Sequence, residues 1–139
     1  MNREDVLKKS ESTLIVKRIF IENMSFQRKE LLNRNLRLSQ SSIGKNVEQV
    51  ADNEYKCSLA LKLSDEEETA MLEIVVSGIF DFNSELKDEQ KQIIITKNTM
   101  AILFPYLRAQ VTLITSQPDV EPVVIPAINI NSLLQNIED

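Results

Sequence analysis

The sequence predicts an α+β fold, a four-stranded antiparallel sheet followed by two C-terminal helices, in a single domain over residues 1–139. Two observations support this prediction. Up to about residue 83, apolar residues alternate with polar ones or form β-branched runs, as they do in strands. From Asp88 onwards, apolar residues recur at spacings of three and four, as they do along one face of a helix.

The first predicted strand covers residues 14–26, where Ile, Val and Phe dominate and neither Gly nor Pro occurs. Its apolar residues fall on both odd and even positions. We therefore expect both faces of this strand to be covered for part of its length. Residues 27–34 are mostly polar and charged, and they predict a crossover loop.

A short second strand is predicted at residues 35–42, because Leu36 and Leu38 alternate there with polar residues. The following segment, residues 43–53, contains Gly44, two Asn and one Asp. These residue types are common in turns and loops, so this segment predicts a connection and not a strand.

The third and fourth strands have the clearest patterns. Residues 54–63 alternate cleanly and predict a half-buried strand, with Tyr55, Cys57, Leu59, Leu61 and Leu63 on the apolar face. An acidic turn follows, in which we expect Asp65 to stay in water. Residues 68–82 predict the fourth strand, with Ala70, Leu72, Ile74, Val76, Phe80 and Phe82 on one face. Gly78 interrupts this strand and predicts a bulge or a close approach of backbone.

The rest of the chain predicts a long helix, an extended link and a short helix. Pro105 lies inside the helical pattern and should kink the long helix or divide it near residue 104. Three prolines within residues 117–128 exclude a helix there. Asn129 or Asn131 is positioned to cap the last helix, which is predicted to run through Gln135.

The predicted sheet has more apolar surface than two helices can cover. The strands beginning at Leu14 and Thr69 are apolar on both parities, and Met71, Val75 and Ile79 are the surplus in the second. Helices on one side of a sheet cover one face only. We therefore expect another copy of the chain, or a bound polypeptide, to cover the remainder.

Composition excludes several classes of function. There is no His, so no Ser–His or Cys–His pair can form, and a single Cys cannot supply a tetrahedral zinc site. The net charge of −5 argues against binding nucleic acid. The N-terminus has no signal-peptide pattern and no apolar run approaches the length of a membrane span, so we expect a cytoplasmic protein. We therefore predict no enzymatic activity, with no catalytic residue, cofactor or metal.

The run ILFPYLR at residues 102–108 closely resembles the ILFPYAR run of SecB, the bacterial protein-export chaperone family. Three further stretches agree with that family in the same order. They are VKRIFIENMSF at 16–26, the triplets ETA and GIF at 68–70 and 78–80, and the proline-rich link ending at Pro126 and Asn129. Together these stretches extend over nearly the whole chain.

The resemblance implies an ATP-independent molecular chaperone, a holdase that keeps precursor chains unfolded for protein export and passes them to the SecA motor. It also implies a homotetramer, a dimer of dimers, in the cytoplasm. Two alternatives stay open: a SecB-like chaperone of a toxin–antitoxin system, and a structural oligomeric adaptor without client binding. Neither membrane insertion nor nucleic acid is expected.

The resemblance also assigns site residues. The apolar groove for unfolded clients should be lined by Leu36, Leu38, Ile130, Leu133, Leu134 and Ile137, with Leu133 packing inward and Leu134 and Ile137 facing the client. Acidic residues of the family's sheet contact SecA. Here the matching positions Asn23 and Gln27 are neutral, and only Glu73 is acidic. Client holding is therefore better supported than delivery to SecA, because the attraction of two charges is lost.

Overall fold

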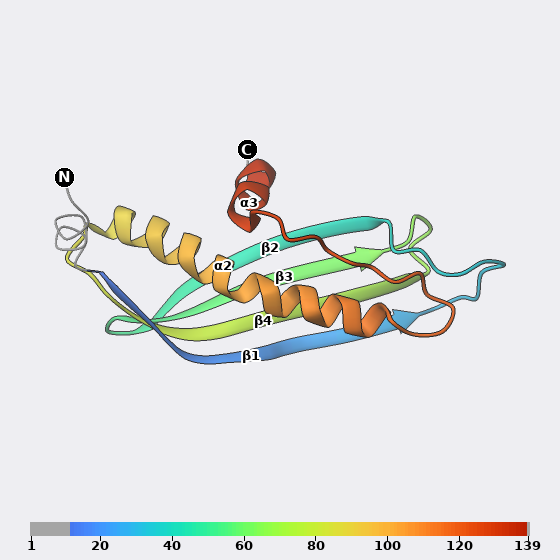
Figure 1. Ribbon diagram of the computed structural model, residues 1–139, viewed down its shortest axis with the longest axis horizontal. Helices are drawn as coiled ribbons and strands as arrows, with labels where there is room; N and C mark the ends of the chain where they lie inside the picture. Colours follow the sequence, from blue (N-terminus) through green and yellow to red (C-terminus); the bar gives the residue numbers. More distant parts are fainter. Residues whose placement is uncertain (1–11, 139) are drawn as a thin grey trace.

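The computed structural model describes residues 12–138, with side chains through Gln135. Four strands precede two helices (Figure 1). The elements are β1 (Thr13–Arg28), β2 (Gln40–Ala51), β3 (Glu54–Ser64), β4 (Ala70–Asn83), α2 (Asp88–Thr115) and α3 (Ile130–Glu138). The strands form one antiparallel sheet in the order β1-β4-β3-β2. The predicted α+β architecture is confirmed.

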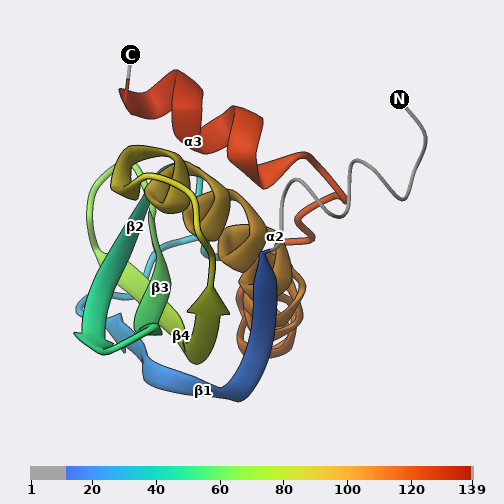
Figure 2. The same cartoon turned by 90° about the vertical axis from the view of Figure 1, so that its left-hand side faces the viewer.

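The core lies between the sheet and α2, on the face of the sheet that we call the inner face. Both helices lie on that side (Figure 2). Burial alternates along the central strands β3 and β4 except at Ser77, and every residue predicted for their apolar faces is buried. Helix α2 contributes Ile95, Met100, Leu103, Phe104, Leu107 and Val111 to the same core. The opposite, outer face carries no helix within residues 12–138.

Two bulges in β1 change which residues share a face. Register shifts occur between Val16 and Arg18 and between Ile21 and Asn23. Each bulge adds one residue and reverses the parity of the residues after it. As a result, Ile21 pairs with Val76, on the same inner face as Val16. The interpretation of β1 as apolar on both faces is therefore wrong for most of its length.

The predicted second strand is wrong. Strand β2 starts at Gln40, so only residues 40–42 of the predicted strand belong to it. It continues to Ala51 through most of the segment predicted as a connection. The turn to β3 is short, with Asn53 at a φ of 58°. Leu36 and Leu38 precede β2, and Leu36 forms an isolated bridge with Val120. Strand β2 is a mostly exposed edge strand, so its sequence has little apolar alternation, and its extended form comes from pairing with β3.

Asp65 is not in water as predicted, since only 2% of its surface is exposed. The Thr69 hydroxyl donates to its carboxylate, and the Ala70 amide donates to Oδ1 at 3.0 Å. Burial favours the neutral acid, but these hydrogen bonds outweigh burial and hold the pKa of Asp65 below its ordinary value. The carboxylate therefore organises the turn between β3 and β4.

The sequence predicts special roles for Pro105 in α2 and for Gly78 in β4. Helix α2 runs through Pro105 to Thr115 as one helix, so the predicted division near residue 104 is not observed. The Pro105 ring is on the exposed side of α2. The predicted close approach at Gly78 is confirmed, because a Cβ there would lie 2.6 Å from the Phe80 ring.

Residues 117–129, which we call the link, join α2 to α3. Residues 117–119 form a turn, with Asp119 at a φ of 67°, and from the bridge at Val120 onwards the link has neither helix nor strand, as predicted. Asn129 caps α3: its Oδ1 accepts the amides of Asn131 at 3.1 Å and Ser132 at 3.3 Å. No helix of the described residues is both long and apolar enough to cross a bilayer.

Candidate functional site

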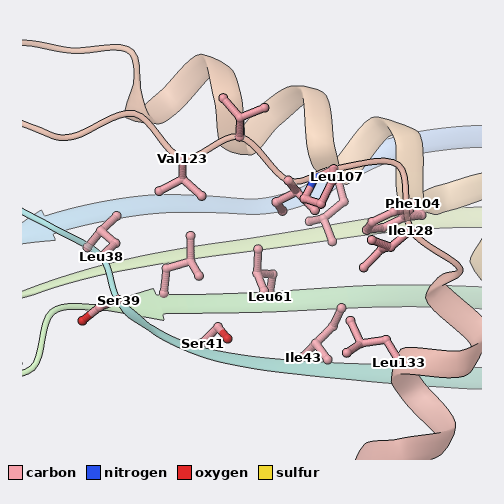
Figure 3. Close-up of a pocket in the computed structure, with 14 residues that line it drawn as sticks. Leu38, Ser39, Ser41, Ile43, Leu61, Phe104, Leu107, Val123, Ile128 and Leu133 are labelled. Atoms are coloured by element: carbon pink, nitrogen blue, oxygen red, sulfur yellow. The ribbon is translucent and has the colours of Figure 1, made fainter.

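A groove of about 330 Å³ lies on the inner side of the sheet, between β2 and the link (Figure 3). Its floor is the inner face of β3. One wall is the end of the crossover together with β2, the other is the link with α2, and α3 closes one end. The lining residues are Leu38, Ser39, Ser41, Ile43, Leu61, Leu63, Phe104, Leu107, Val123, Val124, Ile125, Pro126, Ile128 and Leu133.

The groove is apolar and uncharged. None of its lining residues has an ionisable side chain, and the only polar side chains among them are those of Ser39 and Ser41. Apolar side chains at its rim are open to solvent: Val124 is 72% exposed and Ile128 is also exposed. Exposed apolar surface in a concave site is typical of places where proteins bind other apolar groups.

The structure separates the six predicted groove residues. Leu38 and Leu133 line the groove, at opposite ends of it. Leu36, Ile130 and Leu134 are buried in the core and do not line it. The side chain of Ile137 lies outside the described residues.

The predicted orientation of the last helix is wrong for the residues described. Leu134 is 4% exposed, whereas Leu133 faces the groove. The reason is the helical period: Ile130 and Leu134 are four residues apart and share one face, and that face packs into the core. Leu133 is turned away from this face and lies near Ile43 of β2. The client-binding role of all these residues stays a prediction.

Most of the groove wall is absent from the predicted site. Ile43 falls in the segment predicted as a connection, and the link is predicted only to be extended. A signal is present in the sequence, because Val123, Val124, Ile125 and Ile128 form an apolar run that the prolines keep out of a helix. Extended apolar residues without a pairing strand remain available to a ligand.

The three positions matched to SecA contacts lie together on the outer face. Asn23 pairs with Val75, Gln27 with Met71, and Glu73 pairs with Ser25 between them. Elsewhere on this face, Lys56 Nζ lies 2.5 Å from a Glu22 carboxylate oxygen. This bond, with a second from the Ser77 hydroxyl, lowers the pKa of Glu22. The acidic charge of Glu22, the residue before Asn23, is thus paired within the chain.

The structure thus combines an antiparallel sheet that has its helices on one face with an open, uncharged groove beside an edge strand. The family model described as "Preprotein translocase subunit SecB" matches residues 7–138. The chain belongs to the SecB family, which is a family of protein-export chaperones.

Relatives are distant in sequence. The protein-export protein SecB of Orientia tsutsugamushi (strain Ikeda) is 22% identical over 139 residues, covering 94% of this chain and 84% of its own length. An uncharacterized protein of Methanocaldococcus jannaschii is 38% identical over 68 residues, which are 49% of this chain and 43% of that protein.

Among solved structures, a SecB-like chaperone of Mycobacterium tuberculosis has the same fold. It superposes with a TM-score of 0.66 at 12% identity, over 89% of this chain and 91% of that one. That protein was solved in complex with a ChAD peptide from the HigA1 antitoxin.

Proposed function

We propose that this chain is an ATP-independent holdase that binds apolar segments of unfolded polypeptides in the groove. The observation that supports this most directly is the uncharged groove between β2 and the link. Unfolded chains expose the apolar side chains that such a groove accepts, and folded ones bury them. A protein that binds only the unfolded form draws the folding equilibrium towards that form.

Suppression of aggregation tests this proposal. A client enzyme is heated or diluted from denaturant, and its light scattering is followed with and without the chain, in the absence of ATP. We expect a delay in scattering that grows with the ratio of chain to client. Scattering that proceeds unchanged at equimolar oligomer would exclude a holdase and favour the alternative of a structural oligomeric adaptor.

We place this chain in the cytoplasm and consider two roles for it, protein export and a toxin–antitoxin system. Export fits the family, with SecA as the receiving partner. A toxin–antitoxin role is the second candidate, because the Mycobacterium tuberculosis neighbour was solved with an antitoxin peptide. Purification of the tagged chain from its native cell separates the two. A bound precursor that retains its signal sequence supports export, and a bound antitoxin supports the second role.

We further propose that the chain forms a homotetramer, a dimer of dimers, in which a second copy covers the inner face of β1. Val16, Ile21 and Met24 on that face are exposed, because α2 lies mainly over β3 and β4. Exposed apolar residues along an edge strand are a common site of self-association.

A matched pair of methionines tests this interface. Met24, on the inner face of β1, is 46% exposed, and Met71, on the outer face of β4, is 45% exposed. We expect Met24→Lys to lower the mass measured by light scattering after gel filtration, and Met71→Lys to leave it unchanged. The opposite pattern would place the interface on the outer face, which carries the surplus residues Met71, Val75 and Ile79 that the sequence predicts to be covered.

A further inference from the structure

The link forms a single bridge of a parallel ladder with the crossover. The Leu36 amide donates to the Asp119 carbonyl at 2.9 Å, and the Glu121 amide donates to the Leu36 carbonyl at 2.8 Å. This is one step of a parallel ladder, centred on Val120. The next step would consist of two bonds, from the Leu38 amide to the Glu121 carbonyl and from the Val123 amide to the Leu38 carbonyl.

Neither bond of that step forms, and the Val123 amide is bonded to α2 instead. The Val123 amide donates to Thr115 Oγ1 at 3.0 Å. Thr115 is fully buried, and its own hydroxyl donates back to the Val111 carbonyl at 2.7 Å. The hydroxyl therefore acts as donor and acceptor at once, and its orientation is fixed by the last turn of α2.

A second contact from α2 reaches the link two residues later. Arg108 Nε donates to the Ile125 carbonyl at 3.0 Å, and its guanidinium carbon lies 5.9 Å from the centre of the Phe104 ring. Ile125 and Phe104 both line the groove. Arg108 thus ties the link to α2 beside the groove wall.

We propose that Thr115 and Arg108 are positioning residues that hold the link away from β2 and keep the groove open. The proposal rests on the proposed function in assigning this groove to clients. Buried backbone groups require partners, and the link would otherwise find them by continuing its ladder beside Leu38. Because α2 supplies those partners, the two walls stay apart and the apolar floor stays accessible.

Three variants separate this role from general stability. Thr115→Val removes the acceptor and keeps the shape of the side chain. Arg108→Met removes the donor and keeps an apolar stem beside Phe104. Because Arg108 is partly exposed, we expect this variant to fold, so it tests the inference even if Thr115→Val fails to fold. The control is Arg37→Met. Exposed Arg37 also contacts the link, with its Nε 3.9 Å from a carboxylate oxygen of Glu121, but neither residue lines the groove.

The width of the groove is measured directly by electron–electron spin distances. Labels are placed through Ser39→Cys and Val124→Cys, two exposed positions on opposite walls, in labelled chains diluted with unlabelled ones. Cys57 is fully buried, and burial raises the pKa of its thiol, so it stays unlabelled. We expect a shorter distance in Thr115→Val and Arg108→Met than in the wild type and in Arg37→Met.

Client affinity completes the test. Loss of one hydrogen bond should weaken binding of a reduced and alkylated, permanently unfolded protein by roughly 2- to 10-fold. An unchanged spin distance overturns the inference, and so does a shorter distance with unchanged affinity. If the wild type binds no client, the proposed function fails, and the spin distances alone then decide whether the two residues hold the link.

Discussion

Replacing Val124 by Asp should abolish client holding without unfolding the chain. Val124 lies on the groove wall, and 72% of its surface is exposed, so the folded chain tolerates a charge there. Full burial of a Val-sized side chain contributes about 1.5–3 kcal/mol, and about 72% of that is still available to a client. The substitution therefore removes about 1–2 kcal/mol of apolar contact.

The carboxylate that Val124→Asp introduces adds a second loss. Covering an unpaired polar group costs at least about 1–3 kcal/mol, and no residue that lines the groove is cationic. The two losses together are about 2–5 kcal/mol, which corresponds to a decrease in affinity of roughly 30-fold or more. The assay is fluorescence anisotropy with a labelled, permanently unfolded client.

A matched control separates the groove from exposed apolar surface in general. Leu31 is 84% exposed and does not line the groove, so Leu31→Asp should bind client like the wild type. If Val124→Asp binds as well as Leu31→Asp, clients do not use this groove and its role as the client site is refuted. If both variants lose binding, apolar surface outside the groove also contacts the client.

The last helix, the acidic turn and the outer face each offer one more test. Leu133→Asp should weaken client binding and leave the melting temperature close to that of the wild type, whereas Leu134→Asp should detach α3 from the core; equal melting temperatures would contradict the orientation of that helix. The lowered pKa of Asp65 means that its stabilising effect is present above its ordinary pKa and is lost as the pH falls through its folded-state value. Asp65→Asn should therefore destabilise the fold by about 1–3 kcal/mol at pH 7 in urea titrations and by less in acid; a constant difference across pH would contradict this. Asn23→Asp with Gln27→Glu should strengthen binding to SecA in calorimetry if the outer face is a docking surface, and undetectable binding in both forms would exclude that surface.

The architecture was predictable from the sequence, but its registers were not. Strands β3 and β4 are central and half covered, so burial imposes the alternation by which they are recognised. Strand β1 contains two bulges, and nothing in its composition marks that Lys17 and Glu22 have no partner in the pairing with β4. Strand β2 is at the edge, so few of its side chains are constrained by the core, and its sequence resembles a loop.

The apolar character of the candidate site could be predicted from the sequence, but only some of the residues that line it could be. Leu38 and Leu133 line the groove, but the surrounding wall depends on long-range placement of the link, which no local pattern encodes. The contact between Val123 and Thr115 joins residues eight positions apart across the end of a helix. Such a contact becomes visible only when the helix and the link are both placed in space.

The polar side chains of β2 explain how this strand edge can stay exposed. An unpaired edge invites association with any extended chain. Here β2 carries polar and charged residues such as Lys45 and Glu48 along the edge, and its apolar contribution to the inner face comes from Ile43 and Val47. The apolar surface that a client needs is set back on the floor of β3 and on the link, behind that polar strand. If the groove binds clients as proposed, a segment must be extended and free of its own fold to reach it, and the groove then selects for unfolded chains rather than for a sequence.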